Sequence, residues 1–135
     1  MVKLEHFKPS EFKAYAKMDE GFLRYLDEVR EVAGVAFFLT SDFRTADENA
    51  AAAGSSSASL HLTGNAVDFA TVGSRARMAQ EFYKDCWAIA RACAFVVRPR
   101  NVQLEFVKGP TDWHVHLGLY PAGDVRPSRL IVTAE

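Results

Sequence analysis

The sequence has no long apolar segment and no excess of charge of either sign. Apolar residues make up 49% of the 135 residues, but no run approaches the roughly 18 residues that a membrane-spanning helix needs. The formal net charge is −1 and Lys and Arg do not cluster, so a nucleic-acid-binding function has no electrostatic support. The N-terminus also lacks the apolar core of a secretory signal. We therefore expect synthesis in the cytoplasm, with any export by another route.

Cysteine is scarce as well. Cys86 and Cys93, the only two in the chain, are seven residues apart in a segment that is predicted to be helical. Two helical turns separate them by about 10 Å, whereas a disulfide needs Cα atoms within about 7 Å. We therefore expect two free, buried thiols that have no role in metal binding.

Hydrophobic periodicity predicts one α+β domain over residues 1–135. Helices are expected from the N-cap Ser10, over Glu20–Ala33 with Gly34 at its end, and over about 75–92 with Ser74 as its N-cap. The Ala- and Ser-rich loop 46–58 has room for a short helix over 47–53. Strands are predicted over 35–41, 66–70, 94–97, 102–107, 112–117 and 130–132. These elements favour a small antiparallel sheet of about four strands with helices on one side.

The segment 102–117 has the pattern of a β-hairpin around the turn sequence Lys108-Gly109-Pro110-Thr111. A loop of those four residues would pair Val107 with Asp112, Glu105 with His114 and Gln103 with His116. Alternation then sorts the side chains into two faces. The polar face would hold Gln103, Glu105, Asp112, His114 and His116, and the apolar face Leu104, Phe106, Trp113, Val115 and Leu117. So many polar groups on one face are costly if they are buried without a purpose, which indicates a functional site.

Three of the four histidines lie in two short segments, each beside acidic residues. His61 and Asp68 are seven residues apart with a Gly-containing turn between them, and His114 and His116 follow near the far end of the chain. Imidazole nitrogen and carboxylate oxygen are preferred zinc ligands, and a catalytic zinc keeps one position for water. We therefore predict one Zn²⁺ held by His61, Asp68 and one of the two hairpin histidines.

Nearby polar residues suggest hydrolytic chemistry at this zinc. Zinc-bound water is acidified and a bound carbonyl is polarised. Glu105 or Asp112 could take the proton from that water and pass it to a leaving amine, and the remaining histidine could stabilise the oxyanion or share the proton transfer. Arg44 follows a predicted buried strand, where it could bind a carboxylate or tie down the loop 46–58. The residues alone leave both roles of Arg44 open.

The first metal motif resembles that of a known family. Ser59-x-His61-x-x-Gly64-x-Ala66-x-Asp68 is similar to the first zinc motif of the D-Ala-D-Ala carboxypeptidase/endopeptidase family. Ser41-Asp42-Phe43-Arg44-Thr45 resembles the segment that precedes it in that family, with Asp42 in place of the usual Gly. His114-Val115-His116 is similar to the His-x-His motif of lysostaphin-type peptidases and the hedgehog domain. The resemblance covers residues from about 7 to 118.

The resemblance implies specific roles. It makes His116 the third zinc ligand beside His61 and Asp68, and His114 a catalytic neighbour. Many members have Glu or Asp three residues before the last ligand, where this chain has Trp113. The general base therefore stays open between Glu105 and Asp112. The expected substrate-binding residues are Arg44, Ser59 and Gln103.

The family's substrates imply a zinc peptidase that acts on the stem peptides of bacterial peptidoglycan, as a phage endolysin or prophage lysis enzyme would. We expect a hedgehog/D-Ala-D-Ala-peptidase-like fold, a monomer, a peptidoglycan peptide as partner and no nucleic acid. Two alternatives stay open: a zinc-containing binding module without turnover, and a hydrolase of a small dipeptide or another amide. The sequence does not identify the bond that is cut.

Overall fold

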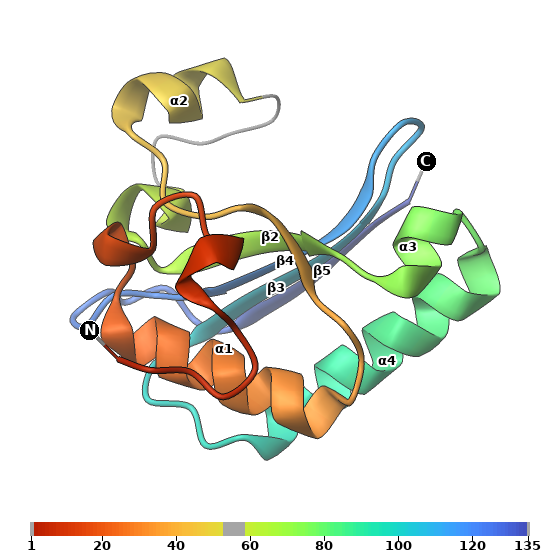
Figure 1. The fold of residues 1–135 in the computed structure, drawn as a ribbon, viewed down its shortest axis with the longest axis horizontal. Helices are drawn as coiled ribbons and strands as arrows, with labels where there is room; N and C mark the ends of the chain where they lie inside the picture. The colour runs from red at the N-terminus through yellow and green to blue at the C-terminus, as the bar shows by residue number, and fades with distance from the viewer. Residues whose placement is uncertain (1, 53–58, 135) are drawn as a thin grey trace.

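The strands form one mixed sheet. The computed structural model describes residues 2–52 and 59–134, and these residues contain five strands in the order β1-β2-β4-β3-β5. Their bounds are β1 Phe38–Ser41, β2 Ala66–Ala70, β3 Val102–Lys108, β4 Trp113–Leu119 and β5 Arg129–Ala134. The predicted α+β class is confirmed (Figure 1).

The sheet differs from the expected antiparallel one at a single pairing. β1–β2, β2–β4 and β3–β4 are antiparallel, but β3 and β5 are parallel. The chain leaves β4 at the end of the sheet where β3 begins, and residues 120–128 carry it across that end to the far side of β3. A strand that starts there must run in the direction of β3, so β5 is parallel to it.

Helices α1 (Glu20–Ala33) and α4 (Ala79–Phe95) pack against each other and against one face of the sheet (Figure 1). Their buried side chains join those of the strands in one core, including Phe22, Leu26, Phe82, Ile89, Phe69, Val115 and Leu117. The bounds of α1 agree with the prediction, because both of its ends are marked locally. The Asp19 side chain accepts a hydrogen bond from the N–H of Phe22, and Gly34 ends the helix at φ +68°.

Three predicted elements were wrong. The helix expected from Ser10 is replaced by two 3₁₀ turns, Pro9–Glu11 and Tyr15–Lys17, and the N-cap of the first turn is Lys8. The helix expected over 75–92 is divided into α3 (Val72–Ala76) and α4 by Arg77, whose φ is +57°. Thr71, not Ser74, caps α3 and accepts a hydrogen bond from the N–H of Ser74.

The third error is the strand predicted over 94–97. Helix α4 continues to Phe95, and Val97 beyond it is 87% exposed. The apolar residues 94–97 therefore have the sequence pattern of a short buried strand, but they lie at and just beyond the end of α4. In the loop 46–58, a helix does form as α2, Ala46–Ala51, but residues 53–58 lie outside the described residues.

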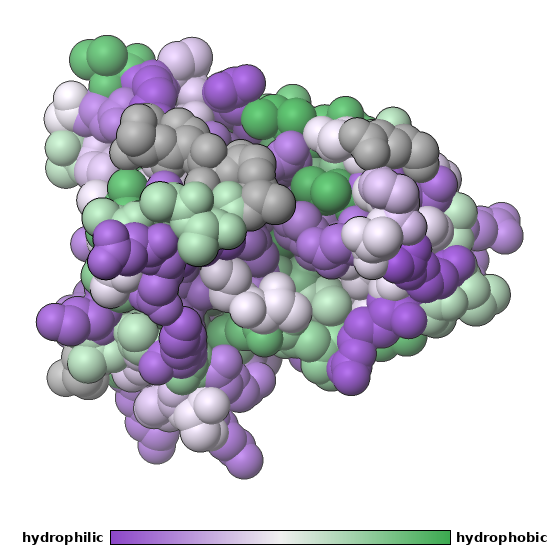
Figure 2. Space-filling model, turned by 90° about the horizontal axis from the view of Figure 1, so that it is seen from above, coloured by the Kyte–Doolittle hydropathy of each residue, from purple (hydrophilic) through white to green (hydrophobic). Residues whose placement is uncertain are grey.

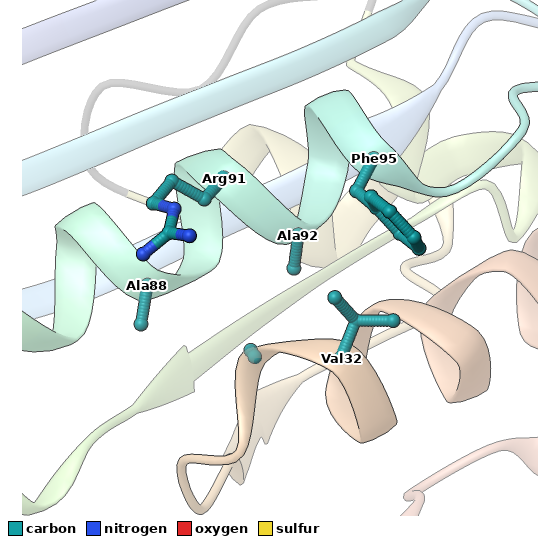
Figure 3. Close-up of a pocket in the computed structure, with 6 residues that line it drawn as sticks. Val32, Ala88, Arg91, Ala92 and Phe95 are labelled. Atoms are coloured by element: carbon teal, nitrogen blue, oxygen red, sulfur yellow. The ribbon is translucent and has the colours of Figure 1, made fainter.

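Two hollows lie along α4. One is a pocket between the C-terminal parts of α1 and α4, lined by Val32, Ala33, Ala88, Arg91, Ala92 and Phe95 (Figure 3). The other is an apolar groove between α4 and β5, with Trp87 and Val132 among its lining residues. Neither is lined by His61, Asp68 or His116.

Within the described residues, no helix is long and apolar enough to cross a membrane.

Candidate metal centre

Three side chains from separate elements converge beside the sheet. His61 lies in the 3₁₀ helix η3 (Leu60–Thr63), Asp68 in β2 and His116 in β4. Antiparallel pairing places Asp68 directly opposite His116, and residues opposite each other share a face of the sheet. This is the face away from α1 and α4, because the neighbouring residues Val67, Phe69, Val115 and Leu117 point into the core. Figure 2, viewed from the α2 side, shows hydrophilic and hydrophobic side chains interspersed over the surface.

The spacing of the ligand atoms suits a small divalent metal. Asp68 Oδ1 is 3.3 Å from His61 Nε2 and 2.9 Å from His116 Nδ1. All three ligand atoms lie within 4.8 Å of one another. Tetrahedral zinc with bonds of 2.0–2.1 Å would separate its ligand atoms by about 3.3 Å. The three residues therefore fit a zinc ion with only small adjustments.

Hydrogen bonds on the outer side of each imidazole set its tautomer. His61 Nδ1 lies 2.7 Å from the carbonyl oxygen of Asp42, and His116 Nε2 lies 2.7 Å from the amide oxygen of Gln103. Both oxygens can only accept, so each outer nitrogen carries a hydrogen. A neutral imidazole then has its lone pair on the inner nitrogen. Two lone pairs and a carboxylate would repel one another around an empty centre, but they are what a metal cation binds.

Asp68 is held in its ionised form. Burial by itself raises the pKa of this carboxyl, but hydrogen bonds from His116 and then His61, which form when these rings carry a hydrogen on the inner nitrogen, outweigh burial and lower the pKa well below its ordinary value. A metal cation bound in place of those hydrogens would favour the ionised carboxylate in the same way. The second oxygen, Oδ2, accepts a hydrogen bond of 3.2 Å from the Arg44 guanidinium. Oδ1 is therefore shared by the two histidines, while Arg44 holds the other oxygen and the orientation of the carboxylate.

Gly64 makes the tight turn that joins His61 to Asp68. Its φ is +69°, in the left-handed region that favours glycine, and its N–H donates to the carbonyl of His61. A Cβ at this position would overlap the carbonyl oxygen of Lys17 and lie 2.9 Å from Met18 Cα. A hydrogen bond from the N–H of Asp19 to the Gly64 carbonyl also joins the turn to residues 17–19. Only glycine fits both the backbone conformation and the space.

The predicted hairpin exists, but its pairing was wrong by two residues. Glu105 faces His116, Val107 faces His114 and Lys108 faces Trp113. The four-residue loop is 109–112, which is closed by a hydrogen bond from the N–H of Gly109 to the carbonyl of Asp112. A shift of two residues leaves every strand side chain on its predicted face, because the period of a strand is two. The polar face is therefore as expected, and the direct partners are not.

A family comparison supports a metallopeptidase. A family model described as Peptidase M15 matches residues 5–93, which include His61 and Asp68. The chain belongs to the Peptidase M15 family. His116 lies beyond the matched residues, and the pairing of β2 with β4 brings it to the other two side chains. No curated protein and no solved structure matches the chain.

The two candidate bases of this M15 peptidase lie in different surroundings. Glu105 is half-buried on β3, and its Oε2 accepts a hydrogen bond of 3.1 Å from the Thr133 hydroxyl. Asp112 lies in the hairpin loop with 74% of its side chain exposed. Its Oδ2 is 2.9 Å from His114 Nδ1, close enough for an ion pair but not aligned as a hydrogen bond. Glu105 is thus beside the candidate metal ligands, and Asp112 is beside His114.

The residues expected to bind substrate contact the candidate ligands. Arg44 reaches Asp68, and it also lies 3.2 Å from the Ser41 hydroxyl and 3.5 Å from Asn49 Oδ1 in α2. Ser59 caps η3 and accepts a hydrogen bond from the N–H of His61. Gln103 contacts His116. Arg44 thus has a protein carboxylate as one partner and α2 as another, and its contact with a substrate carboxylate stays a prediction.

Sequence reasoning missed two supporting groups. The Asp42 carbonyl fixes His61, and its carboxylate accepts hydrogen bonds from the N–H groups of Lys13 and Ala14. The Tyr120 hydroxyl accepts a hydrogen bond from the Gln103 amide. No sequence signal could identify the Asp42 carbonyl, because every residue has one. Tyr120 directly follows β4, but nothing in its local sequence indicates a hydroxyl directed at Gln103.

Proposed function

We propose that this protein is a zinc-dependent peptidase that hydrolyses peptide bonds in the stem peptides of bacterial peptidoglycan. The observation that supports it best is the pair of imidazoles whose outer nitrogens are hydrogen-bonded and whose inner nitrogens converge on Asp68. Two histidines without a shared ligand would not need outer hydrogen bonds that direct both inner nitrogens at one carboxylate. Membership of the Peptidase M15 family supplies the reaction class.

His61 Nε2, Asp68 Oδ1 and His116 Nδ1 would hold the zinc. When bound, zinc acidifies a water molecule and polarises the carbonyl of the scissile bond. Glu105 would take the proton of the attacking water, because it lies directly opposite His116 on the same face of the sheet. It would then donate that proton to the nitrogen of the leaving amine. This proton transfer requires a carboxylate beside the metal ligands, and Glu105 supplies one.

His114 would bind the oxygen that becomes negatively charged as water adds to the carbonyl. It lies two residues before His116 on β4, so both side chains point to the same face. The nearby Asp112 carboxylate would orient its ring and stabilise its protonated form. Asp112 therefore assists through His114, whereas Glu105 handles the proton directly.

The test is to incubate the zinc-loaded protein with purified peptidoglycan and to identify the released muropeptides by mass spectrometry. New stem-peptide fragments should appear with the native protein and be absent with His116→Ala. The fragment masses would identify the bond that is cut. A chain that binds one zinc but releases no fragments would contradict the proposal and favour a zinc-containing binding module of the hedgehog type. Cleavage of free dipeptides alone would favour the small-amide hydrolase.

A further inference from the structure

We propose that Gln103 is a positioning residue for His116, and that Tyr120 holds the Gln103 amide in place. The pair would select the tautomer of His116 that is able to bind metal. This inference rests on the proposed function, because it assigns a role at the same centre. It differs from the sequence-based expectation for Gln103, which was contact with the substrate.

The strand pairing explains how Gln103 reaches His116. Gln103 pairs directly with Gly118, which has no side chain, and His116 is the diagonal neighbour two residues away on β4. Diagonal neighbours on one face of a sheet are within reach of long side chains. The Gln103 amide oxygen therefore extends along β4 to within 2.7 Å of His116 Nε2. A Cβ at position 118 would lie 2.9 Å from the carbonyl oxygen of Asn65 and 2.9 Å from Leu60 Cδ1, so close packing favours glycine there.

Tyr120 holds the second end of the amide. The amide nitrogen of Gln103 donates to the Tyr120 hydroxyl at 3.3 Å, which leaves the amide oxygen for His116. Tyr120 is itself held in place: it is buried, and the Arg126 guanidinium lies 4.6 Å from the centre of its ring. The hydroxyl is therefore a fixed anchor for the Gln103 amide nitrogen.

The orientation of the amide decides what His116 offers to the centre. With the amide oxygen at Nε2, this nitrogen carries the hydrogen, and the lone pair on Nδ1 points at Asp68. If the amide turned over, its NH₂ group would donate to Nε2 and stabilise the other tautomer. Nδ1–H would then bond to the Asp68 carboxylate, and the position required by the metal would be blocked. Partners of this kind typically change metal affinity by about 10- to 100-fold.

The deciding experiment measures zinc affinity by competition with a chromophoric chelator. Gln103→Leu removes the acceptor, and we expect zinc affinity to fall by about 10- to 100-fold. Gln103→Glu offers only acceptor oxygens, so affinity should be equal to or higher than that of the native protein. Tyr120→Phe frees the amide to turn over and should weaken zinc binding by less than Gln103→Leu does. Gln80→Leu, on the exposed side of α4, is the matched control and should bind zinc as the native protein does.

A second measurement is independent of catalysis. Long-range ¹H–¹⁵N NMR correlations report which imidazole nitrogen carries the hydrogen. The native zinc-loaded protein should have His116 protonated at Nε2, and metal-free Gln103→Leu should have a mixture of tautomers while the dispersion of its other resonances shows that it is folded. Equal weakening of zinc binding by Gln103→Leu and Gln103→Glu would indicate a packing role and overturn the inference. The inference would also be overturned if folded Gln103→Leu bound zinc with native affinity. A changed KM in that variant would then indicate that Gln103 contacts the substrate.

These outcomes separate the inference from the proposed function. If the native protein binds zinc but cleaves no peptide, the peptidase proposal fails, and the chelator titration still decides the role of Gln103. If the native protein cleaves peptidoglycan and Gln103→Leu binds zinc normally, only the inference fails. A native protein that binds no zinc would overturn both.

Discussion

Glu105 lies directly opposite His116 in the β3–β4 pairing, and both side chains are on the face of the sheet that holds Asp68. The predicted pairing had placed Glu105 opposite His114. The observed one brings this carboxylate next to a candidate zinc ligand, whereas Asp112 lies in the exposed loop beside His114. The relationship makes Glu105 the preferred general base, and it can be tested by substitution.

Replacing Glu105 by Gln should abolish most of the activity and leave the metal in place. General acid–base catalysis contributes about 10²- to 10⁴-fold, so kcat should fall by about that factor. Zinc should stay at one per chain, because Glu105 is not among the three converging side chains. Peptidoglycan cleavage rates and metal analysis measure the two effects, with Glu28→Gln on the exposed face of α1 as control.

Asp112→Asn should have a much smaller effect than Glu105→Gln. Exposed ion pairs contribute about 0–1 kcal/mol, so loss of the Asp112–His114 pair should lower kcat by less than about tenfold. The measurement is the same cleavage assay. If Asp112→Asn were the more damaging of the two substitutions, Asp112 would be the base and Glu105 a structural residue.

Gly64→Ala should destabilise the fold more than Gly34→Ala. Gly64 and Gly34 have nearly the same positive φ, +69° and +68°, so an alanine would have a strained backbone at either position. Only at Gly64 would the added Cβ meet neighbouring backbone, since nothing lies within 4 Å at Gly34. Strain and overpacking together should lower the free energy of unfolding by at least about 2 kcal/mol for Gly64→Ala, and strain alone by about 1 kcal/mol for Gly34→Ala. Equal losses in urea denaturation would show that the close packing at Gly64 is unimportant.

Arg44→Ala should weaken zinc binding, because Asp68 Oδ2 loses its partner. A ligand that is no longer oriented typically costs about tenfold or more in metal affinity. Arg44→Lys should restore little of this affinity, since an ammonium group cannot match the flat guanidinium that also reaches Ser41 and Asn49. Chelator competition provides the measurement, and Arg24→Ala on the exposed face of α1 is the control. If Arg44→Ala changed only KM, Arg44 would be a substrate-binding residue as the sequence suggested.

The two cysteines should react slowly in the folded protein. Both are free and buried, and burial raises the pKa of Cys86 to about 12, with a smaller effect from Asp85, and that of Cys93 to about 11. Little thiolate is therefore present near pH 8, and alkylation should be slow until urea unfolds the chain. The folded state disfavours the thiolate. The free energy of unfolding should thus be unaffected by these thiols below about pH 8.5, the unfolded value, and decrease as the pH rises towards their folded values.

Comparison with a Cys86→Ala, Cys93→Ala double variant isolates this effect from other groups that titrate in alkali. The double variant should lose stability less steeply above about pH 8.5. Rapid alkylation of both thiols at neutral pH without denaturant would contradict the assignment of both as buried and inert.

Local patterns in the sequence determined a large part of this protein. The bounds of α1 followed from helical spacing and Gly34, and the faces of the hairpin from strict alternation. The contiguous motif from Ser59 to Asp68 indicated His61 and Asp68 as candidate metal ligands, because its turn is built from neighbours in the chain. Each of these features depends on residues within a few positions of one another, so the sequence alone contains the necessary information.

The tertiary structure decided what depends on contacts between distant segments. The hairpin pairing shifted by two residues without moving a side chain to the other face, so alternation could not detect the shift, yet it set the partner of His116. The parallel β5 and the continuation of α4 to Phe95 likewise depend on packing rather than on local preference. The tautomers of His61 and His116 are set by a backbone carbonyl and by the amide of Gln103, which also contacts Tyr120. A hydrogen bond has a direction and a length, and only the folded chain specifies both.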